Sequence, residues 1–512
     1  MNIFVNFFHV FLPLNRNASL SFLFLKKRKI SQSTVRSDFR AFRACIIGSG
    51  PAGFYTADRL LRSIPRCEID MYEALPMPFG LVRFGVAPDH YEIKNVQNQF
   101  SKIAESKNFH FIGNIRIGRD ISLQQLKPYY DCMVMAYGAS KDKELGLAGE
   151  ESIRGIYSAR SFVGWYNGHY AFQELNPDLE STDLAIIIGH GNVALDIARI
   201  LLVDPNVLEK TDISEKAMEC LRKSKIKHVK IIGRRGPMQM SFSTKELRRL
   251  TEFSTISFCT PNLDFYINQS LLSNDLARSK KRLFDLLLKK NVLKPNTTNK
   301  LWSLEFLLSP YQFMKYKSKS DTLSSVLFEK NILKECPYEN ILKAVGTGEI
   351  INIDTGCLIR SIGYKGVAIE NSEDIGIPFD TNKGIIPNVS GRVLSTYNMN
   401  PSETFELPGI YTSGWIKTGP IGVIANTMYD AFETSDCIIE DWKNGKLFLN
   451  PTSVELKPGF NALLSYFKEK NIQYIQWKDW QKLNDLENKI GKRLGKVRKK
   501  ITSIKEIFEI IK

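Results

Sequence analysis

The chain has 512 residues, of which 43% are hydrophobic and 24% are charged. This composition lies in the ordinary globular range and excludes a wholly disordered chain, and the length allows two or more packed domains. The formal net charge of +16 favours an acidic partner, a nucleic acid, a membrane surface or an organelle-targeting segment, but it does not distinguish between them.

The first forty residues differ in composition from the rest of the chain. Asp38 is their only acidic residue, whereas seven residues are Lys or Arg and many others are Ser or Asn. Leaders of this kind are typical of mitochondrial transit peptides. The apolar run 1–14 leaves a secretory leader or the first step of a route into a plastid-like organelle open, and a disordered extension without an address is a further alternative. We expect residues 1–40 to be a targeting leader for the mitochondrial matrix, with a plastid-like organelle as the alternative.

The body of the chain opens on a glycine-rich loop. An apolar run, 44–47, leads into Gly48-Ser49-Gly50-Pro51-Ala52-Gly53, and a helical stretch follows over 54–61. In this G-x-G-x-x-G pattern, Gly48 permits the tight strand-to-helix turn, Gly50 lets a pyrophosphate approach the backbone, and Gly53 lets the helix pack on the strand. The helix N-terminus then offers free N–H groups to the phosphates.

The strand that follows this helix ends in an acid. Residues 68–73 form a predicted strand that finishes on Glu73, about 20 residues after the loop, where a carboxylate accepts hydrogen bonds from the ribose hydroxyls of an adenosine. The alternative for Glu73 is a solvated charge at the end of a strand. Because the whole strand–loop–helix–strand pattern is present, we predict a dinucleotide site.

A second loop of the same kind lies far downstream. The apolar, β-branched strand 184–188 is followed by Gly189-His190-Gly191-Asn192-Val193-Ala194 and a helical stretch over 195–202. Alanine is an accepted variant at the last position of the motif. The next predicted strand, 228–233, ends in Arg234 and Arg235 instead of an acid. A guanidinium pairs with a 2′-phosphate that a carboxylate would repel, so this site is predicted to bind NADP(H). The alternative for the arginine pair is a solvated basic turn.

Two dinucleotide sites in one chain predict an α/β flavoprotein with two Rossmann-like dinucleotide-binding domains, one for FAD and one for NADP(H). Apolar strands at 132–139 and 357–363 are expected where the chain crosses between the domains, so the NADP domain interrupts the FAD domain. The predicted parts are a first FAD part, an NADP domain, and a second FAD part with a C-terminal extension, over residues 41–145, 146–355 and 356–512. Near 291–352 we expect an insertion, with a Ser- and Lys-rich surface segment at 315–325.

Residues from about 41 to the end resemble the NADPH:adrenodoxin reductases, a family of mitochondrial ferredoxin–NADP⁺ reductases with a glutathione-reductase-like fold. The blocks that carry the resemblance are 78–90, 94–96, 158–168, 191–199, 233–237, 245–248, 361–365, 413–417 and 419–424, whereas the stretch 291–352 matches poorly apart from 301–313. The resemblance implies FAD contacts at Ala52, Glu73, Leu81, Ile117, Trp415, Gly422, Val423 and Ile424. It implies NADPH contacts at Gly189, His190, Gly191, Asn192, Val193, Arg234, Arg235, Glu246 and Gly422. The family usually has Gln where His190 stands.

Two further sets of residues are of interest beside the resemblance. The first is a basic cluster, in which two arginines share a helix face; its residues are Arg278, Lys281 and Arg282. Since the resemblance implies that an acidic ferredoxin docks on a basic face, we predict that it docks here. An ordinary solvated surface is the alternative. Asp196 and His90 lie in the most family-specific blocks, and we hypothesise that they shape a proton path at the flavin. The alternative for this pair is helix capping or packing.

The predicted activity is hydride transfer from NADPH to FAD, followed by transfer of single electrons to an acidic [2Fe–2S] ferredoxin that serves iron–sulfur assembly or cytochrome P450 acceptors. The eight cysteines form no CxxC pair and no metal-ligand spacing, which argues against a disulfide reductase, an iron–sulfur subunit or a metal site. Another acceptor, or a nucleic-acid-binding flavoprotein that uses the basic tail 492–500, remains an alternative, although we expect no nucleic acid. We expect a monomer, with peripheral contact to the inner membrane left open.

Overall fold

The computed structural model describes residues 40–264, 266–267, 277–292, 300–316, 321–336, 341–397, 400–422, 424–449 and 456–512. Residues 1–39 of the predicted leader and the predicted FAD contact Val423 lie outside the described residues. The described residues belong to one compact unit, Phe39–Lys512, and everything below concerns this unit. No helix among the described residues is long and apolar enough to cross a membrane.

A seven-stranded sheet takes its strands from both ends of this unit, in the order β16-β17-β18-β4-β1-β2-β3. The strands are β1 (Phe42–Ile47), β2 (Cys67–Tyr72), β3 (Phe109–Ile112), β4 (Cys132–Met135), β16 (Asn388–Val389), β17 (Arg392–Tyr397) and β18 (Asn400–Thr412). The strands from β18 to β3 run parallel, and β1 at their centre is buried along its whole length. Apart from Arg43, which pairs with Asp70, its side chains are apolar, as suits a parallel strand that is covered on both faces.

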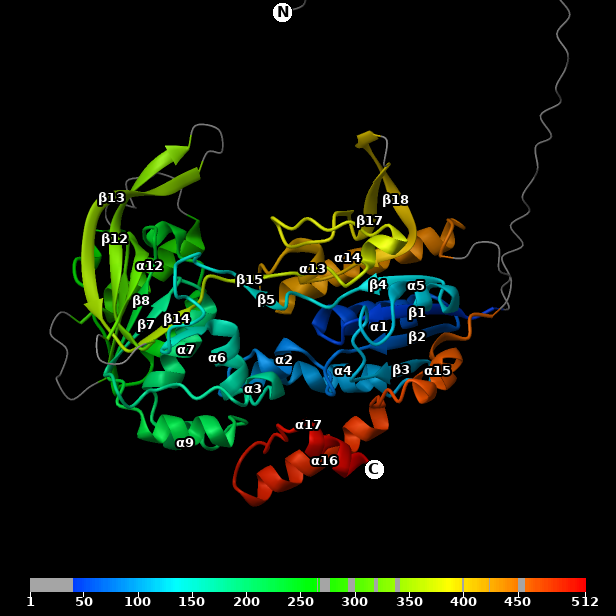
Figure 1. Cartoon of the computed structure of the whole chain (residues 1–512), viewed down its shortest axis with the longest axis horizontal. Helices are drawn as coiled ribbons and strands as arrows, with labels where there is room; N and C mark the ends of the chain where they lie inside the picture. The colour runs from blue at the N-terminus through cyan, green and yellow to red at the C-terminus, as the bar shows by residue number, and fades with distance from the viewer. Residues whose placement is uncertain are drawn as a thin grey trace, which may run out of the picture. The chain divides into compact units, whose positions relative to one another are not determined.

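Helices cover this first sheet. The helices of this part are α1 (Pro51–Ser63), α2 (Leu81–Phe84), α3 (Tyr91–Lys94), α4 (Val96–Ala104), α5 (Leu123–Leu126), α13 (Trp415–Thr418), α14 (Ile424–Lys443), α15 (Leu464–Glu469), α16 (Trp477–Arg493) and α17 (Ile504–Ile511). The helix after the first phosphate loop, α1, packs against α14. The C-terminal helices α16 and α17, drawn in red in Figure 1, lie next to each other below β3.

A six-stranded parallel sheet occupies the middle of the sequence, in the order β6-β14-β7-β8-β10-β9. Its strands are β6 (Ile156–Ser158), β7 (Leu184–Ile188), β8 (His228–Ile232), β9 (Ile256–Phe258), β10 (Lys300–Glu305) and β14 (Cys357–Arg360). Its helices are α6 (Ala159–Tyr166), α7 (Asn192–Leu202), α8 (Pro205–Leu208), α9 (Glu215–Lys223), α10 (Thr244–Thr251) and α12 (Arg278–Lys290). The predicted α/β architecture, in which one parallel-sheet domain interrupts another, is confirmed.

The chain crosses between the two sheets twice, and the crossings touch. The short strands β5 (Lys141–Asp142) and β15 (Tyr364–Lys365) pair antiparallel immediately after β4 and β14. Because β14 pairs with β6 and β7, the return crossing follows Arg360. The predicted boundary at residue 355 therefore falls too early, since the apolar strand after it belongs to the six-stranded sheet.

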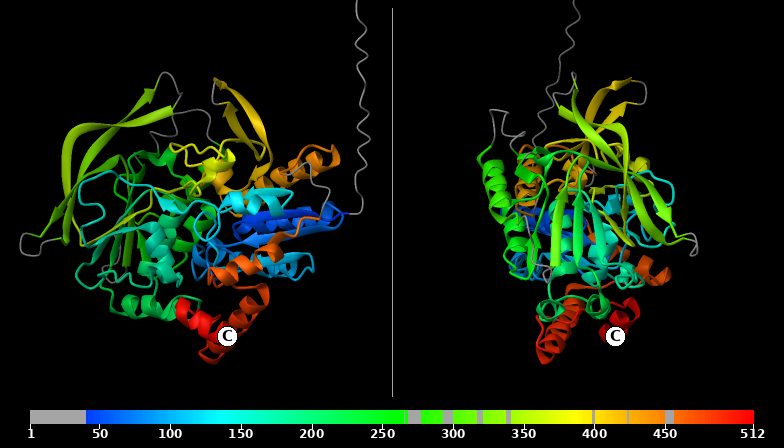
Figure 2. Two further views of the ribbon diagram at one scale, coloured as in Figure 1. Left: turned by 45° about the vertical axis from the view of Figure 1, so that its right-hand side comes forward. Right: turned by 90° about the vertical axis from the view of Figure 1, so that its left-hand side faces the viewer.

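The predicted insertion near 291–352 is only partly an insertion. Its strand β10 lies inside the six-stranded sheet, where Trp302 is fully buried. The remainder forms a separate antiparallel sheet of β11 (Leu308–Lys315), β12 (Leu323–Cys336) and β13 (Ile341–Asp354), whose long strands reach away from the six-stranded sheet (Figure 2). In the predicted surface segment 315–325, the exposed side chains of Lys315 and Asp321 form an ion pair of 3.0 Å, and residues 317–320 lie outside the described part.

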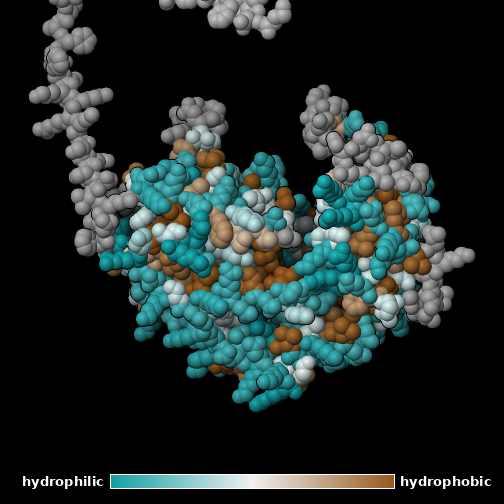
Figure 3. Space-filling model, turned by 180° about the vertical axis from the view of Figure 1, so that it is seen from behind, coloured by the Kyte–Doolittle hydropathy of each residue, from teal (hydrophilic) through white to brown (hydrophobic). Residues whose placement is uncertain are grey.

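Short 3₁₀ helices complete the described elements, at Lys127–Tyr129, Tyr170–Phe172, Pro237–Gln239, Ser372–Ile375 and Gly459–Leu463. On the face seen in Figure 3 most of the described surface is hydrophilic, and hydrophobic residues gather near its centre, around a hollow. The phosphate loops follow β1 and β7, so both lie at the carboxyl ends of parallel strands, where dinucleotides bind in folds of this class.

Candidate dinucleotide sites and active site

The glycines of the first loop are fixed by close backbone contacts. Gly48 has a φ of +109°, and a Cβ there would lie 2.5 Å from the carbonyl oxygen of Ala136. A Cβ on Gly53 would lie 2.1 Å from the carbonyl oxygen of Gly48. Gly50 differs, because among the described residues, apart from its two chain neighbours, no heavy atom lies within 4 Å of the position that its Cβ would take. The loop therefore leaves open space at the glycine that is predicted to face a pyrophosphate, as a bound dinucleotide requires.

Glu73 is held in place by the same loop. Its Oε2 accepts hydrogen bonds from the backbone N–H of Ser49 (2.9 Å) and from the Ser49 hydroxyl (2.7 Å), and its Oε1 accepts one from the N–H of Leu75 (2.9 Å). A carboxylate has about four acceptor positions, so it retains capacity for ribose hydroxyls. A cavity of about 360 Å³ is lined by Ala74 and Arg116, the chain neighbours of Glu73 and Ile117. The residues present thus fit the adenosine end of FAD.

Two further predicted FAD contacts are brought to this loop by segments distant in sequence. A Cβ on Gly80, the residue before Leu81, would lie 3.4 Å from the Cα of Gly50. A Cβ on Gly414, the residue before Trp415, would lie 2.5 Å from the Cβ of Ala52. Both segments therefore run close to the first loop, which is the arrangement that a single extended cofactor needs.

The ring of Trp415 also contacts β15, the strand in the return crossing between the sheets. The rings of Tyr364 and Trp415 are stacked, with their centroids 5.9 Å apart and an interplanar angle of 26°. The helix α14 begins at Ile424 and comes after the short helix α13, which begins at Trp415. Such a helix end stabilises negative charge on a neighbouring group.

The second loop repeats the geometry of the first. Gly189 has a φ of +117°, and a Cβ there would lie 2.2 Å from the carbonyl oxygen of Ser361. The His190 ring packs on Phe306, with centroids 5.1 Å apart, and its Nε2 lies 3.1 Å from the carbonyl oxygen of Ile231. Burial lowers the pKa of His190 to about 4, so the ring is neutral at pH 7. The side chain that replaces the family's usual Gln is thus a packed interior group.

The segment before α10 connects this loop to Glu246. The carbonyl oxygen of His190 accepts hydrogen bonds from the N–H and hydroxyl of Ser241, both 2.9 Å, and the Oδ1 of Asn192 accepts one from the N–H of Ser243 (2.8 Å). The Ser243 hydroxyl then caps α10 by accepting from the N–H of Glu246 (3.3 Å). The second phosphate loop and Glu246 are therefore held in a fixed relation.

Arg234 and Arg235 follow β8 with exposed side chains. Within the described part of the chain neither guanidinium makes a hydrogen bond or an ion pair. Their backbone is anchored by the insertion, because the Nδ2 of Asn331 donates to the Arg234 carbonyl (3.0 Å) and the N–H of Leu307 donates to the Arg235 carbonyl (3.3 Å). Two unpaired guanidinium groups on a fixed turn fit the 2′-phosphate of NADPH.

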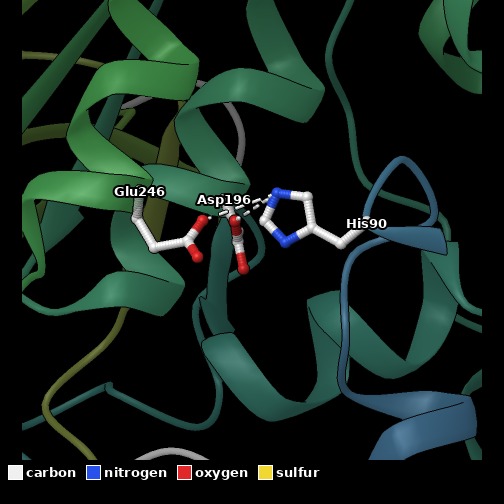
Figure 4. A group of neighbouring side chains, drawn as sticks. All are labelled: His90, Asp196 and Glu246. Carbon is white, nitrogen blue, oxygen red and sulfur yellow. Dashed lines mark ion pairs between the residues drawn. The ribbon is translucent and has the colours of Figure 1, made fainter. Parts of the chain in front are cut away.

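The side chains of His90, Asp196 and Glu246 point toward one another and form one cluster (Figure 4). The Nε2 of His90 lies 3.7 Å from the Oδ1 of Asp196 and 3.5 Å from the Oε2 of Glu246. These distances are longer than hydrogen bonds, and within the described structure the His90 Nε2 and the Glu246 Oε2 are buried without a hydrogen-bond partner. His90 precedes α3 in the FAD part, whereas the two acids lie on α7 and α10.

Arg199 organises the charges of this cluster. Its guanidinium donates to Asp196 (2.8 Å) and to Asp89, the neighbour of His90 (2.6 and 3.0 Å). Burial raises the pKa of Asp196 to about 6, and burial together with the charge of Asp196 raises the pKa of Glu246 to about 7. Burial and the Arg199 charge lower the pKa of His90 to about 3. The cluster therefore changes its protonation in the neutral range through its acids, and these acids titrate as a coupled pair.

The chain is similar to known reductases along nearly its whole length, although no family model matches it. The probable mitochondrial NADPH:adrenodoxin oxidoreductase of Schizosaccharomyces pombe is 42% identical over 479 residues, which cover 91% of this chain and 95% of the relative. The human mitochondrial NADPH:adrenodoxin oxidoreductase is 40% identical over 475 residues, and 91% of each chain is covered. The chain belongs to the NADPH:adrenodoxin oxidoreductase family.

A solved relative supports the same family. The structure of Mycobacterium tuberculosis FprA in complex with NADPH has a TM-score of 0.82 and 34% sequence identity, and the match covers 92% of this chain and 100% of FprA. The resemblance to the NADPH:adrenodoxin oxidoreductase family that the sequence motifs indicate is confirmed. For a member of this family the basic surface of α12 is of interest: Arg278, Lys281 and Arg282 are exposed, whereas Lys280 is turned inward and donates to the Met240 carbonyl.

Several residues that position the candidate sites were not predicted from the sequence. Arg199 and Asp89 lie inside family-specific blocks, but nothing in one sequence indicates that they pair. Ser243 could have been found, because Ser243 and Glu246 have the S-x-x-E spacing of a capped helix start. Asn331 carries no local pattern, and its contact with the arginine turn depends on the tertiary fold.

Proposed function

We propose that this protein is a mitochondrial NADPH:ferredoxin oxidoreductase that uses FAD. The observation that carries the proposal is the pair of phosphate loops, one associated with the carboxylate of Glu73 and the other followed by the unpaired guanidinium groups of Arg234 and Arg235. The family membership supports the same activity. When bound, FAD accepts a hydride from NADPH and releases its two electrons singly to a one-electron acceptor.

We assign the cofactor contacts as follows. Glu73 and the loop of Gly48, Gly50, Ala52 and Gly53 hold the adenosine and pyrophosphate of FAD, and Leu81, Ile117, Trp415, Gly422 and Ile424 hold the remainder. Gly189, Gly191, Asn192, Val193 and Glu246 hold NADPH together with the arginine pair, and the packed ring of His190 leaves its backbone as the contacting part. Hydride transfer itself needs no reacting side chain from either set, because both sets orient the cofactors and exclude water.

The chain's own chemistry in this scheme is proton handling by His90, Asp196 and Glu246. Their pKa values support this role, because Asp196 and Glu246 titrate near neutral pH while the His90 imidazole stays neutral. Asp196→Asn should slow reduction by NADPH and leave the FAD content unchanged. A packing role alone would lower cofactor content or thermal stability and leave the reduction rate per bound flavin intact, and that outcome would contradict the assignment.

The partner and location follow from the same proposal. The relatives' names say adrenodoxin and mitochondrial, and we propose an acidic ferredoxin that docks on Arg278, Lys281 and Arg282 in the matrix. A monomeric state and contact with the inner membrane stay predictions. The nucleic-acid alternative is weakened by the tail, whose Lys496, Arg498 and Lys500 are engaged in ion pairs.

The proposal is tested on the purified protein. It should show flavin absorbance, and NADPH should bleach that absorbance without oxygen much faster than NADH does. Glu73→Ala should lose flavin, while Glu68→Ala on β2, the strand that precedes Glu73, should keep it. A correctly folded protein that contains no flavin and binds none on reconstitution would overturn the proposal.

A further inference from the structure

The part of the basic tail 492–500 that follows α16 is built into the body of the protein. The N–H of Val497 donates to the carbonyl of Lys210 (3.1 Å), and Lys496 pairs with Glu215 (2.5 Å). The N–H of Lys499 donates to the carbonyl of Glu487 on α16 (3.1 Å). The tail therefore joins the C-terminal helices, red in Figure 1, to the segment at the start of α9 in the other domain.

Under the tail lies a cluster of buried charges. The Asp212 carboxylate accepts from the Nζ of Lys94 (2.7 and 2.9 Å) and lies 2.9 Å from the Nζ of Lys500. The Glu487 carboxylate, which is fully buried, pairs with Arg83 (2.6 Å) and with Arg498 (3.1 Å). Among the described residues, four basic side chains thus face two carboxylates, so basic groups outnumber acidic ones in this cluster.

The cationic groups are close enough to perturb one another. Burial, and then the charges of Arg498 and Arg83, lower the pKa of Lys94 despite its pairing with Asp212. Buried charges that are not neutralised destabilise a folded protein. A surplus of this kind is relieved when a counterion binds.

A small pocket lies at this point. It has a volume of about 100 Å³, and its lining includes Arg83, Lys94 and Arg498 with the amides of Asn95 and Asn98. Arg83 is 1% exposed, and its Nε and Nη1 have no hydrogen-bond partner within the described structure. Asp212 also lines the pocket, but two lysines already neutralise its charge. Pockets for drug-sized ligands have about 300–1,000 Å³, so this one accepts a small ion and excludes a nucleotide.

We propose that this pocket binds a small oxyanion of the phosphate or sulfate class, held by Arg83, Lys94 and Arg498. Guanidinium and ammonium groups are the side chains that match oxyanions best. The site is formed by α2, α3 and the C-terminal tail, and it is separate from the arginine turn that is proposed to bind the NADPH 2′-phosphate. It does not depend on the proposed reductase activity.

An oxyanion in this pocket would contact both the tail and the first domain. Because the pocket exists only in the folded protein, binding of the ion stabilises the folded state by mass action. Sulfate and phosphate, but not chloride at equal ionic strength, should raise the melting temperature of the FAD-loaded protein. Isothermal titration with inorganic sulfate and with inorganic phosphate should give one site for each. Arg498→Gln should weaken that site about tenfold or more, since it removes a charge-assisted contact.

Three control variants separate the possible outcomes. Arg493→Gln makes the same change at an exposed position of the same C-terminal region and should leave binding intact. The double variant R234A/R235A should also keep this site, and loss of the response there would assign it to the NADPH site instead. Asn98→Asp places a negative charge on an exposed residue of the pocket wall and should abolish binding even if Arg498→Gln fails to fold. Absence of sulfate and phosphate binding in the wild type, or unchanged binding in Asn98→Asp, would overturn the proposal.

Discussion

Preference for NADPH over NADH should depend on the arginine turn after β8. Arg234 and Arg235 are exposed and unpaired within the described residues, so removing their side chains leaves no buried group unsatisfied and changes little else. A hydrogen bond to a charged group contributes about 1.5–3 kcal/mol, and removing one such bond to the 2′-phosphate corresponds to roughly 10- to 150-fold in affinity. The double variant R234A/R235A should therefore raise the KM for NADPH by at least about tenfold and leave the KM for NADH close to its original value.

The assay is steady-state reduction of ferricyanide, which reaches the flavin without a docking partner. Arg248→Ala removes an exposed arginine from α10, away from the turn, and serves as the matched control with an unchanged KM for NADPH. An equal rise of KM for both nicotinamides in the double variant would refute the assignment of the 2′-phosphate to these residues.

Three more outcomes follow from the described contacts. Asn331→Ala removes the hydrogen bond to the carbonyl of Arg234 and should raise the KM for NADPH more than that for NADH; equal changes would point to general unfolding of the insertion. Burial and the charge of Asp196 raise the pKa of Glu246 to about 7, so its carboxyl group is protonated below that pH and ionised above it. Glu246→Gln should therefore remove a pH dependence near 7 from the rate of flavin reduction, and an inflection retained at pH 7 would assign that titration to another group. Charge reversal in Arg278→Glu with Arg282→Glu should strongly reduce ferredoxin-dependent turnover at low salt and leave ferricyanide reduction unchanged. The reason is that exposed charges steer a partner over about 10 Å at 0.1 M salt. Normal ferredoxin turnover in this variant would place the docking surface elsewhere.

The features that can be predicted well from sequence are local. Short runs of apolar residues and glycines predict the strands β1 and β7, their glycine loops and the helices that follow. Strand β10 overlaps the segment 301–313, which resembles the family, but the sequence alone does not show that this strand lies between β8 and β9. The burial of its apolar side chains depends on contacts that form only in the assembled sheet.

The features that escape prediction depend on distant contacts. His90 and Asp196 lie in family-specific blocks and Glu246 is a predicted cofactor contact, but their convergence requires the two domains to be folded against each other. The basic tail suggests a nucleic-acid surface, because charge alone does not reveal that Lys500 is buried against Asp212. Such pairings join residues that are hundreds of positions apart and leave no periodic pattern.

Electron transfer from NADPH to a ferredoxin is the activity on which the functional assignment depends. Reduction of cytochrome c by NADPH should be slow with the purified flavoprotein alone and should rise steeply when an acidic [2Fe–2S] ferredoxin is added, with a rate that falls as salt is increased. A rate that does not respond to the ferredoxin, while ferricyanide reduction by NADPH proceeds normally, would contradict the assignment and leave a flavoprotein reductase with a different acceptor.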